Sequence, residues 1–309
     1  MTEQRVLNLH DLRNLPRETT TAWVTPSVRS RVEAGLGFTL RPPLQPLPSG
    51  VQTLVVIAGG TLIDEAKVWR LENAPLVKLI AVPSIWGSGA EASPIAVRNR
   101  NGKKDIRIDP KLLPDARGVW PELAASVPTP RARMACGDCW AHALEGFLSP
   151  LAGDPLRLEI SKLIRQMLRL PLAGDPAWFE LSARACAGQA QASVGVVHGI
   201  AHVLEGALQA QQPAGDWNHA KLCSIFLFPV MRFNQQASGK WQNLLQQYEL
   251  PADTILKVLR ELFDCHAFDL AIPALSVHWM DILRDPCTRT NSTTVRPSSL
   301  DYFVGKVFL

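Results

Sequence analysis

The sequence predicts an α/β N-terminal domain built on a parallel sheet, followed by an all-α C-terminal domain. Strand-like and helix-like patterns alternate in the first third of the chain, and only amphipathic helical patterns follow after about Pro121. The chain of 309 residues is long enough for two domains and a large core. We therefore expect one domain over residues 1–120 and a second over residues 121–309.

Short β-rich runs that end in turn residues identify the strands of the first domain. They are "TAWVTP" (21–26), "TLVVIAGG" (53–60) and "LVKLIAVPS" (76–84). Between the last two, "TLIDEAKVWRLEN" has apolar residues at helical spacing and begins directly after Gly60. A strand–helix–strand order of this kind places its strands in parallel. The four prolines of "RPPLQPLPSG" (41–50) predict an extended connector.

Amphipathic segments with the 3.6-residue period of a helix fill the second domain. They are "ELAASV", "CWAHALEGFLSPL", "LRLEISKLIRQMLRL", "AWFELSARACAGQAQA", "TILKVLRELFDCHAF" and "PALSVHWMDILRD". The apolar stretch "LCSIFLFPVM" is far shorter than the roughly 20 residues that cross a bilayer, and it predicts a buried helix. "PLAGDP" occurs at 150–155 and again at 171–176, which predicts two similar turns between helices.

Composition and charge argue against several classes of function. The formal net charge of +4 is mild, and the arginines are scattered without interleaved aromatic residues, so we expect no nucleic-acid binding. The start "MTEQRVLNLHDLRNL" has no apolar signal core, and we expect no membrane association. Six cysteines without a secretion signal predict free thiols in a reducing cytoplasm.

Two pairs of polar residues in the helical half have the spacing of a chelating site. Asp138 and His142 lie at i and i+4, as do His198 and His202 in "VHGIAHVLEG", so each pair shares a helix face. His219 stands just before another apolar helix. A carboxylate and imidazoles from separate helices could close around a divalent cation, and such mixed ligands suit Fe(II) or Zn(II). Spacing alone, however, favours hydrogen-bonded core histidines and a local Asp–His contact.

The cysteines flanking Asp138 offer an alternative ligand set. Cys136 and Cys139 form a CxxC motif, and such thiols are ligands in many zinc proteins. Because a second CxxC is absent from the sequence, packing is the favoured interpretation of these two thiols.

Seven segments, in order along the chain, resemble the iron-containing (group III) alcohol dehydrogenase family. They are "AGGTLIDEAKVWR", "AVPSIWGSGAEASPIAV", "DPKLLPD", "CGDCWAHALEGFLSP", "VHGIAHVLEGAL", "NHAKLCSIFLFPVMRFN" and "DPCTRTN". The resemblance covers about residues 50 to 300. It implies a Rossmann-like dinucleotide-binding first domain and a metal-binding helical second domain, an architecture shared with dehydroquinate synthase. It also implies NADP or NAD as cofactor.

The same resemblance assigns roles to individual residues of the helical half. It implies that the metal ligands are Asp138, His142, His198 and His219. His202 resembles the neighbouring histidine near the nicotinamide, and we expect it to be the catalytic proton relay. The chain between His198 and His219 is longer than in the family, and the extra residues fall in "AQQPAGDW", an expected loop insertion. Ala220 follows His219 where the family usually has glycine.

The cofactor residues that the resemblance implies lie in the first domain. They are Gly59, Gly60, Thr61, Asp64, Ser84, Ser88 and Lys104. "AGGTLID" follows a strand, where the N–H groups of a helix can meet phosphate, although many other turns contain paired glycines. Ala58 replaces the first glycine of the family's phosphate loop and Thr61 replaces its serine.

The first domain is shorter than in the family. A helix and part of its connections are missing between Gly35 and Gly50. "TAWVTP" ends in Pro26, where NAD-preferring members often have Asp, and the lack of a carboxylate there favours NADP.

The leading hypothesis is a metal-dependent, NAD(P)-linked enzyme that interconverts an alcohol and an aldehyde or ketone by hydride transfer. We expect a small-molecule alcohol or carbonyl substrate. We also expect a homodimer, with contacts to other pathway enzymes as a further option. A tailoring role in secondary metabolism is the expected place of the enzyme. Two alternatives stay open. One is a non-redox partner subunit that keeps the fold without productive cofactor binding. The other is a metal-dependent lyase of the dehydroquinate-synthase type, a group that uses Glu where this chain has Asp138.

Overall fold

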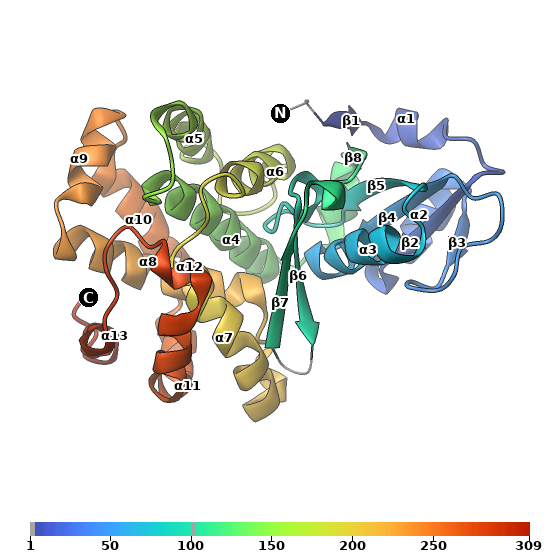
Figure 1. Cartoon of the computed structure of the whole chain (residues 1–309). Coiled ribbons are helices and arrows are strands. Elements are labelled where there is room, and N and C mark those ends of the chain that lie inside the picture. The colour runs from blue at the N-terminus through green and yellow to red at the C-terminus, as the bar shows by residue number, and fades with distance from the viewer. Residues whose placement is uncertain (1–3, 101–102) are drawn as a thin grey trace.

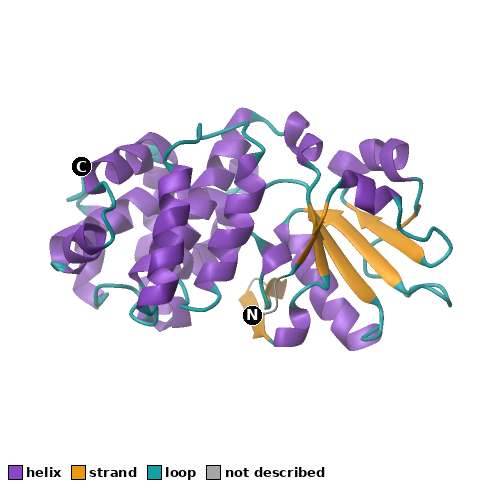
Figure 2. Ribbon diagram, turned by 90° about the horizontal axis from the view of Figure 1, so that it is seen from above, coloured by secondary structure: helices purple, strands orange, loops and turns teal. Residues whose placement is uncertain are grey.

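The computed structural model describes residues 4–100 and 103–309. A parallel sheet with its covering helices forms one half of the molecule, and a bundle of helices forms the other (Figures 1 and 2). The predicted fold class, an α/β half followed by an all-helical half, is confirmed. Within the described ranges, no helix is both long enough and apolar enough to cross a membrane.

The sheet has six strands in the order β1-β8-β5-β4-β2-β3, and every pairing in it is parallel. The strands are β1 (Arg5–Leu7), β2 (Thr20–Val24), β3 (Thr39–Arg41), β4 (Thr53–Ala58), β5 (Lys78–Pro83) and β8 (Ala116–Gly118). Helices α1 (Leu9–Arg13), α2 (Arg29–Leu36) and α3 (Gly60–Asn73) pack on it.

Both faces of the sheet are buried, which explains the continuous apolar runs of its central strands. In β4, Leu54 and Val56 face one hydrophobic cluster together with Ile63 of α3. Val55 and Ile57 point the other way, into a second cluster that contains residues of α1 and α2. This alternation follows from the two-residue period of a strand.

The predicted strands and the connector agree with the structure, and the shortest strands were missed. β2, β4 and β5 occupy the three β-rich runs, and residues 42–52 contain neither helix nor strand, as expected for the connector. β1, β3 and β8 have three residues each. Segments this short have too few residues for a periodic pattern to stand out.

An antiparallel hairpin, which the sequence did not reveal, leaves the sheet half and runs beside the helical half. It consists of β6 (Ile95–Arg100) and β7 (Lys103–Ile108). In Figure 1 it lies next to α7 (Val196–Gln211), and an ion pair between Lys104 of β7 and Glu205 of α7 joins the two. The many charged residues of the hairpin obscure its alternation.

The helical half follows the predicted segments, with differences at their ends. Its helices are α4 (Thr129–Leu148), α5 (Asp154–Met167), α6 (Ala177–Gln189), α7, α8 (His219–Ala237), α9 (Lys240–Gln247), α10 (Ala252–Leu262), α11 (Cys265–Arg284), α12 (Pro286–Arg289) and α13 (Leu300–Val304). The apolar "LCSIFLFPVM" lies inside α8 and is buried, as predicted. "ELAASV" forms a short 3-10 helix, Pro121–Ser126, instead of an α-helix.

The segment expected as one helix over "TILKVLRELFDCHAF" is divided between α10 and α11. The chain is extended at Phe263 and Asp264, and the Asp264 side chain accepts a hydrogen bond from the Ala267 N–H at the start of α11. An aspartate in this position caps a new helix. The predicted helix "PALSVHWMDILRD" is the second half of α11, which continues through Pro273.

Candidate metal centre and nucleotide cavity

A cavity of about 920 Å³ lies where the carboxyl ends of the parallel strands meet the helical half. The loops that follow β2, β4 and β5 line it on one side, and α4, α7 and α8 line it on the other. Ligands of α/β proteins commonly bind at this end of a parallel sheet. The cavity therefore brings the two sets of expected site residues, from the sheet half and the helical half, to one place.

Close packing of α4 against α8 brings the polar residues of these helices together. A Cβ atom on Gly137 would lie 2.6 Å from Ser224 Cβ, so the helices could not approach this closely with a larger residue there. Asp138 follows Gly137 on α4, and His219 begins α8 with Asn218 as its N-cap. The missing side chain at Gly137 thus sets the distance between Asp138 and α8.

Asp138, His198, His219 and Cys223 each offer one ligand atom, and these four atoms all lie within 4.8 Å of one another. Asp138 Oδ1 lies 3.9 Å from His198 Nε2 and 3.9 Å from His219 Nε2. These separations exceed a hydrogen bond. Two atoms that are each bound at about 2 Å to one cation lie about 3.3 Å apart at a tetrahedral angle and about 4 Å apart at most, so both separations are within the reach of a shared cation.

Several of these buried atoms have no hydrogen-bond partner within the described ranges. They include Asp138 Oδ1, His198 Nε2 and His219 Nδ1. Leaving a buried polar group unpaired costs about 1–3 kcal/mol. A cation bound between Asp138 and His198 would satisfy the first two of these atoms together, so the donor set fits a divalent metal of the Fe(II) or Zn(II) type.

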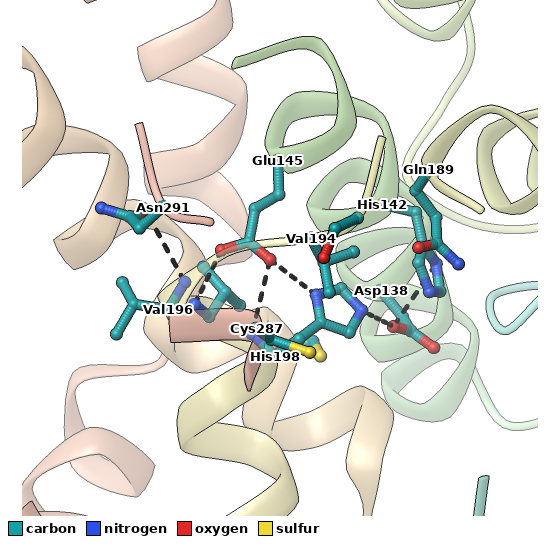
Figure 3. Close-up of polar contacts among 12 residues, drawn as sticks. Asp138, His142, Glu145, Gln189, Val194, Val196, His198, Cys287 and Asn291 are labelled. Carbon is teal, nitrogen blue, oxygen red and sulfur yellow. Dashed lines mark hydrogen bonds and ion pairs between the residues drawn. The ribbon is translucent and has the colours of Figure 1, made fainter. Parts of the chain in front are cut away.

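Glu145 holds His198 from the side opposite to Asp138, as Figure 3 shows. His198 Nδ1 lies 2.7 Å from Glu145 Oε2, and the Val197 N–H donates to Glu145 Oε1 at 2.7 Å. The carboxylate therefore caps the start of α7 and fixes the imidazole, leaving Nε2 directed toward Asp138. Burial raises the pKa of Glu145 to about 7 and lowers the pKa of His198 to about 4.

His142 lies beside this group and is not one of its four members. Its Nδ1 is 3.8 Å from Asp138 Oδ1, and its ring centroid is 4.5 Å from that of His198. His142 Nδ1 also has no hydrogen-bond partner among the described residues, and burial lowers the pKa of the ring to about 4. The expected ligand set is thus gathered in one place, with His142 at its edge.

His202 forms a second polar group with Asp285 and Cys287, which the sequence did not reveal. Its Nδ1 lies 3.3 Å from Asp285 Oδ2 and 3.9 Å from Cys287 Sγ. His202 lines the cavity, and its ring stacks on that of His219 at a centroid distance of 5.6 Å. Asp285 thus fixes the orientation of His202 beside the candidate metal group.

Most of the expected cofactor residues line the cavity. They are Gly59, Gly60, Thr61, Ser84, Ser88 and Lys104. Gly59 is the N-cap of α3, so the first N–H groups of that helix lie at the cavity. Lys104 forms its ion pair with Glu205 at 2.6 Å, and Glu205 also lines the cavity.

Asp64, unlike the other expected cofactor residues, is not among the residues that line the cavity, and it is buried on α3 together with Lys67. Lys67 Nζ is completely buried and donates to Asp64 Oδ1 and to the backbone oxygens of Ala90 and Ile95. Asp64 Oδ2 accepts from the Val97 N–H at 2.9 Å. The pair ties α3 to the loop after β5 and to the hairpin, and both Asp64 carboxylate oxygens accept hydrogen bonds from within the chain.

The CxxC thiols are not part of either polar group. Cys136 and Cys139 are buried in the core of the helical half, in agreement with the interpretation that they are packing residues. Cys223 is the thiol that joins the candidate metal group, and the sequence did not reveal it. Its signal was the i, i+4 spacing from His219, hidden inside the apolar run of α8.

Comparison with solved structures shows how widely this architecture is shared. Sulfoacetaldehyde reductase from Bifidobacterium kashiwanohense, in complex with NAD+, aligns with a TM-score of 0.78 at 16% identity, covering 99% of this chain and 97% of that chain. Iron-containing alcohol dehydrogenase from Thermococcus thioreducens aligns with a TM-score of 0.75 at 19% identity, covering 99% of this chain and 98% of that chain.

Sequence comparison with curated proteins finds alcohol and aldehyde oxidoreductases. The chain is 29% identical over 220 residues to lactaldehyde reductase of Escherichia coli K12, covering 62% of this chain and 56% of that protein. It is 32% identical over 198 residues to 1-propanol dehydrogenase PduQ of Salmonella typhimurium, covering 59% and 52%. The chain is thus similar in sequence to alcohol and aldehyde oxidoreductases and in fold to iron-containing alcohol dehydrogenases. It matches little more than half the length of these curated relatives, and no protein-family model matches it.

Proposed function

We propose that this protein is a metal-dependent, NAD(P)-linked oxidoreductase that interconverts an alcohol and an aldehyde or ketone. One observation carries the proposal. Asp138 and His198 have buried donor atoms without a hydrogen-bond partner among the described residues, and both line the same cavity as the N-terminus of α3. Relatives named for alcohol or aldehyde chemistry support the same reaction class.

Asp138, His198 and His219 would hold the cation, with His142 at the edge of the site and Glu145 orienting His198. A divalent cation supplies a Lewis acid that polarises the oxygen of the substrate. The neighbouring carboxylate and imidazoles keep that part of the cavity polar, whereas Ile85, Met134 and Val194 give it apolar walls. Such walls exclude water and accept the carbon chain of a small alcohol.

Gly59 and Gly60 would receive the cofactor phosphates at the start of α3, and Thr61, Ser84 and Ser88 would add hydroxyl donors. The nicotinamide supplies or accepts the hydride. Thr25 and Ser27 line the cavity beyond the end of β2, and neither carries a charge that would oppose a ribose 2′-phosphate. NADP therefore remains the preferred cofactor, with NAD as the alternative.

His202 would exchange the proton that the reaction releases or consumes. The oxidation of an alcohol by NAD(P)+ gives the carbonyl compound, NAD(P)H and one proton. With Nδ1 held by Asp285, the His202 ring has its Nε2 available for this proton. Its position on the cavity wall, stacked on His219, supports this role.

The test is a spectrophotometric assay with protein loaded with Fe(II) or Zn(II). With NADPH or NADH and an aldehyde such as lactaldehyde or propanal, we expect oxidation of the nucleotide that stops when a chelator removes the metal. If neither nucleotide binds at millimolar concentration, the non-redox partner subunit becomes the better explanation. If the nucleotide binds without any hydride transfer to a broad panel of carbonyl compounds, the metal-dependent lyase becomes the better one.

We also propose a homodimer and a cytoplasmic location. The edge strands β1 and β3 leave both sides of the sheet unpaired among the described residues, and Val6 of β1 is half exposed. Open edges of this kind favour pairing with another chain. The six cysteines are all free thiols, which suits a reducing compartment. Light scattering of the purified protein tests the dimer.

A further inference from the structure

Cys223 lies one helical turn after His219 on α8, and its side chain is completely buried. Because residues at i and i+4 share a helix face, the thiol and the imidazole point to the same place. Cys223 Sγ is 3.5 Å from His219 Nε2. The thiol belongs to the group of four donors, whereas His142, the fourth ligand expected from the family, lies outside it.

The distances agree with a shared cation. For bonds of about 2.3 Å to sulfur and about 2.1 Å to nitrogen at a tetrahedral angle, the two ligand atoms lie about 3.6 Å apart. The separation between Cys223 Sγ and His219 Nε2 is 3.5 Å.

A thiol–imidazole hydrogen bond alone leaves part of the site unexplained. It would pair Cys223 with His219, but Asp138 Oδ1 and His198 Nε2 would still be buried without partners in the described chain. Asp138 and His198 are only 2% and 3% exposed, and a buried polar group without a partner is costly. A cation at the centre of the four donors would bind Asp138 Oδ1, His198 Nε2, His219 Nε2 and the Cys223 sulfur at once, and so would satisfy both of these unpaired atoms.

We propose that Cys223 is a thiolate ligand of the metal, in a site formed with Asp138, His198 and His219. The inference deepens the proposed function and rests on its metal site. On binding, the S–H bond gives its proton to solvent and a sulfur–metal bond forms, with no change of oxidation state. Thiolate ligands favour Zn(II) over harder cations such as Mn(II), so the site prefers Zn(II), and Co(II) serves as its spectroscopic substitute.

The experiment is a Co(II) titration of the metal-free, full-length protein, followed by absorption spectroscopy. We expect visible bands of tetrahedral Co(II) together with a near-ultraviolet thiolate-to-cobalt charge-transfer band. Cys223→Ser should bind Co(II) without the charge-transfer band. Its affinity for Zn(II), measured by competition with a chromogenic chelator, should fall by at least about 10-fold, the lower end of the losses known for residues that only support a ligand.

Cys287→Ser is the matched control, because Cys287 is a second thiol close to these histidines, with its Sγ 3.9 Å from His202 Nδ1. This variant should keep the charge-transfer band. Loss of the band in Cys287→Ser, with retention in Cys223→Ser, would overturn the assignment. The wild-type spectrum is decisive even if a variant does not fold. Visible bands without a thiolate band refute Cys223 as a ligand and leave the proposed metal site intact, whereas no Co(II) binding at all refutes both.

Discussion

Two buried polar clusters, one in the sheet half and one in the helical half, differ in how their atoms are paired. In the cluster of Asp64 and Lys67, the ammonium group has three acceptors and each carboxylate oxygen has a donor. In the cluster around Asp138, Oδ1 and the nearby His198 Nε2 have no partner among the described residues. Burial is similar, since Asp64 is 8% exposed and Asp138 is 2% exposed.

This difference in pairing indicates that the Asp64–Lys67 cluster stabilises the fold, whereas the cluster around Asp138 binds a ligand. A paired ion cluster stabilises the folded chain by its geometry, and removing one member leaves the other charged and buried. An unpaired cluster destabilises the folded chain until a ligand arrives, and binding then adds to stability. Removing one charge from each cluster should therefore change the free energy of unfolding of the metal-free protein in opposite directions.

The largest effect is expected on turnover. His202→Gln should lower kcat by about 10²–10⁴-fold, the usual contribution of general acid–base assistance, because the ring that exchanges the proton is lost. The metal content, measured by elemental analysis, should stay unchanged because His202 is outside the group of four donors. A His202→Gln protein that loses its metal would contradict this division of roles on α7.

Lys67→Met should lower the free energy of unfolding by about 3–5 kcal/mol, because it leaves the buried Asp64 carboxylate without its cation. Chemical denaturation of the metal-free protein measures this loss. Lys162→Met is the matched control, since Lys162 pairs with Glu159 at 2.6 Å on the exposed surface of α5. Its loss should change stability by at most about 1 kcal/mol. Equal losses of stability in Lys67→Met and Lys162→Met would contradict the claim that the buried cluster stabilises the fold.

Asp138→Asn should raise the stability of the metal-free protein by about 1–3 kcal/mol, since it replaces an unpaired buried carboxylate with a neutral amide that can donate to the adjacent imidazoles. The same denaturation experiment applies. A loss of stability as large as that of Lys67→Met would mean that Asp138 belongs to a structural ion cluster.

The smallest effect concerns the phosphate loop. A Cβ atom on Gly59 meets nothing within 4 Å, so Gly59→Ala should keep the stability of the fold. Because its methyl group enters the space expected for phosphate, NAD(P)H affinity should fall by about 10-fold, measured by cofactor fluorescence. In Gly60→Ala the new Cβ would lie 2.8 Å from Ser88 Cβ, so that variant should also lose stability. Unchanged NAD(P)H affinity in Gly59→Ala would show that the phosphates do not bind at this turn.

The sequence predicted the parts of the fold whose signals are local and periodic. The apolar runs of β4 and β5 and the helical pattern between them were sufficient to predict a parallel α/β layer. The hairpin β6–β7 and the three-residue strands depend on contacts with distant segments, which no local pattern records. For the same reason, the division between α10 and α11 at Asp264 escaped prediction.

For the candidate site, too, the sequence predicted the residues with a local pattern and missed those that depend on folding. The i, i+4 pairs, together with the family resemblance, identified the polar residues of α4 and α7, and the structure brings them together with His219. Cys223 was hidden because cysteine is a common core residue in an apolar helix. The pairing of Asp64 with Lys67 and the Val97 N–H could not be predicted, because it appears only when the hairpin is folded against α3.

The most direct test of the account is a Zn(II) titration of metal-free protein, monitored by calorimetry and by thermal unfolding. The wild-type chain should bind about one ion and unfold at a higher temperature in its presence. The double variant Asp138→Ala with His198→Ala should show neither binding nor the stabilisation. Retention of the metal and of the stabilisation in the double variant would contradict the claim that the unpaired cluster around Asp138 is the metal site.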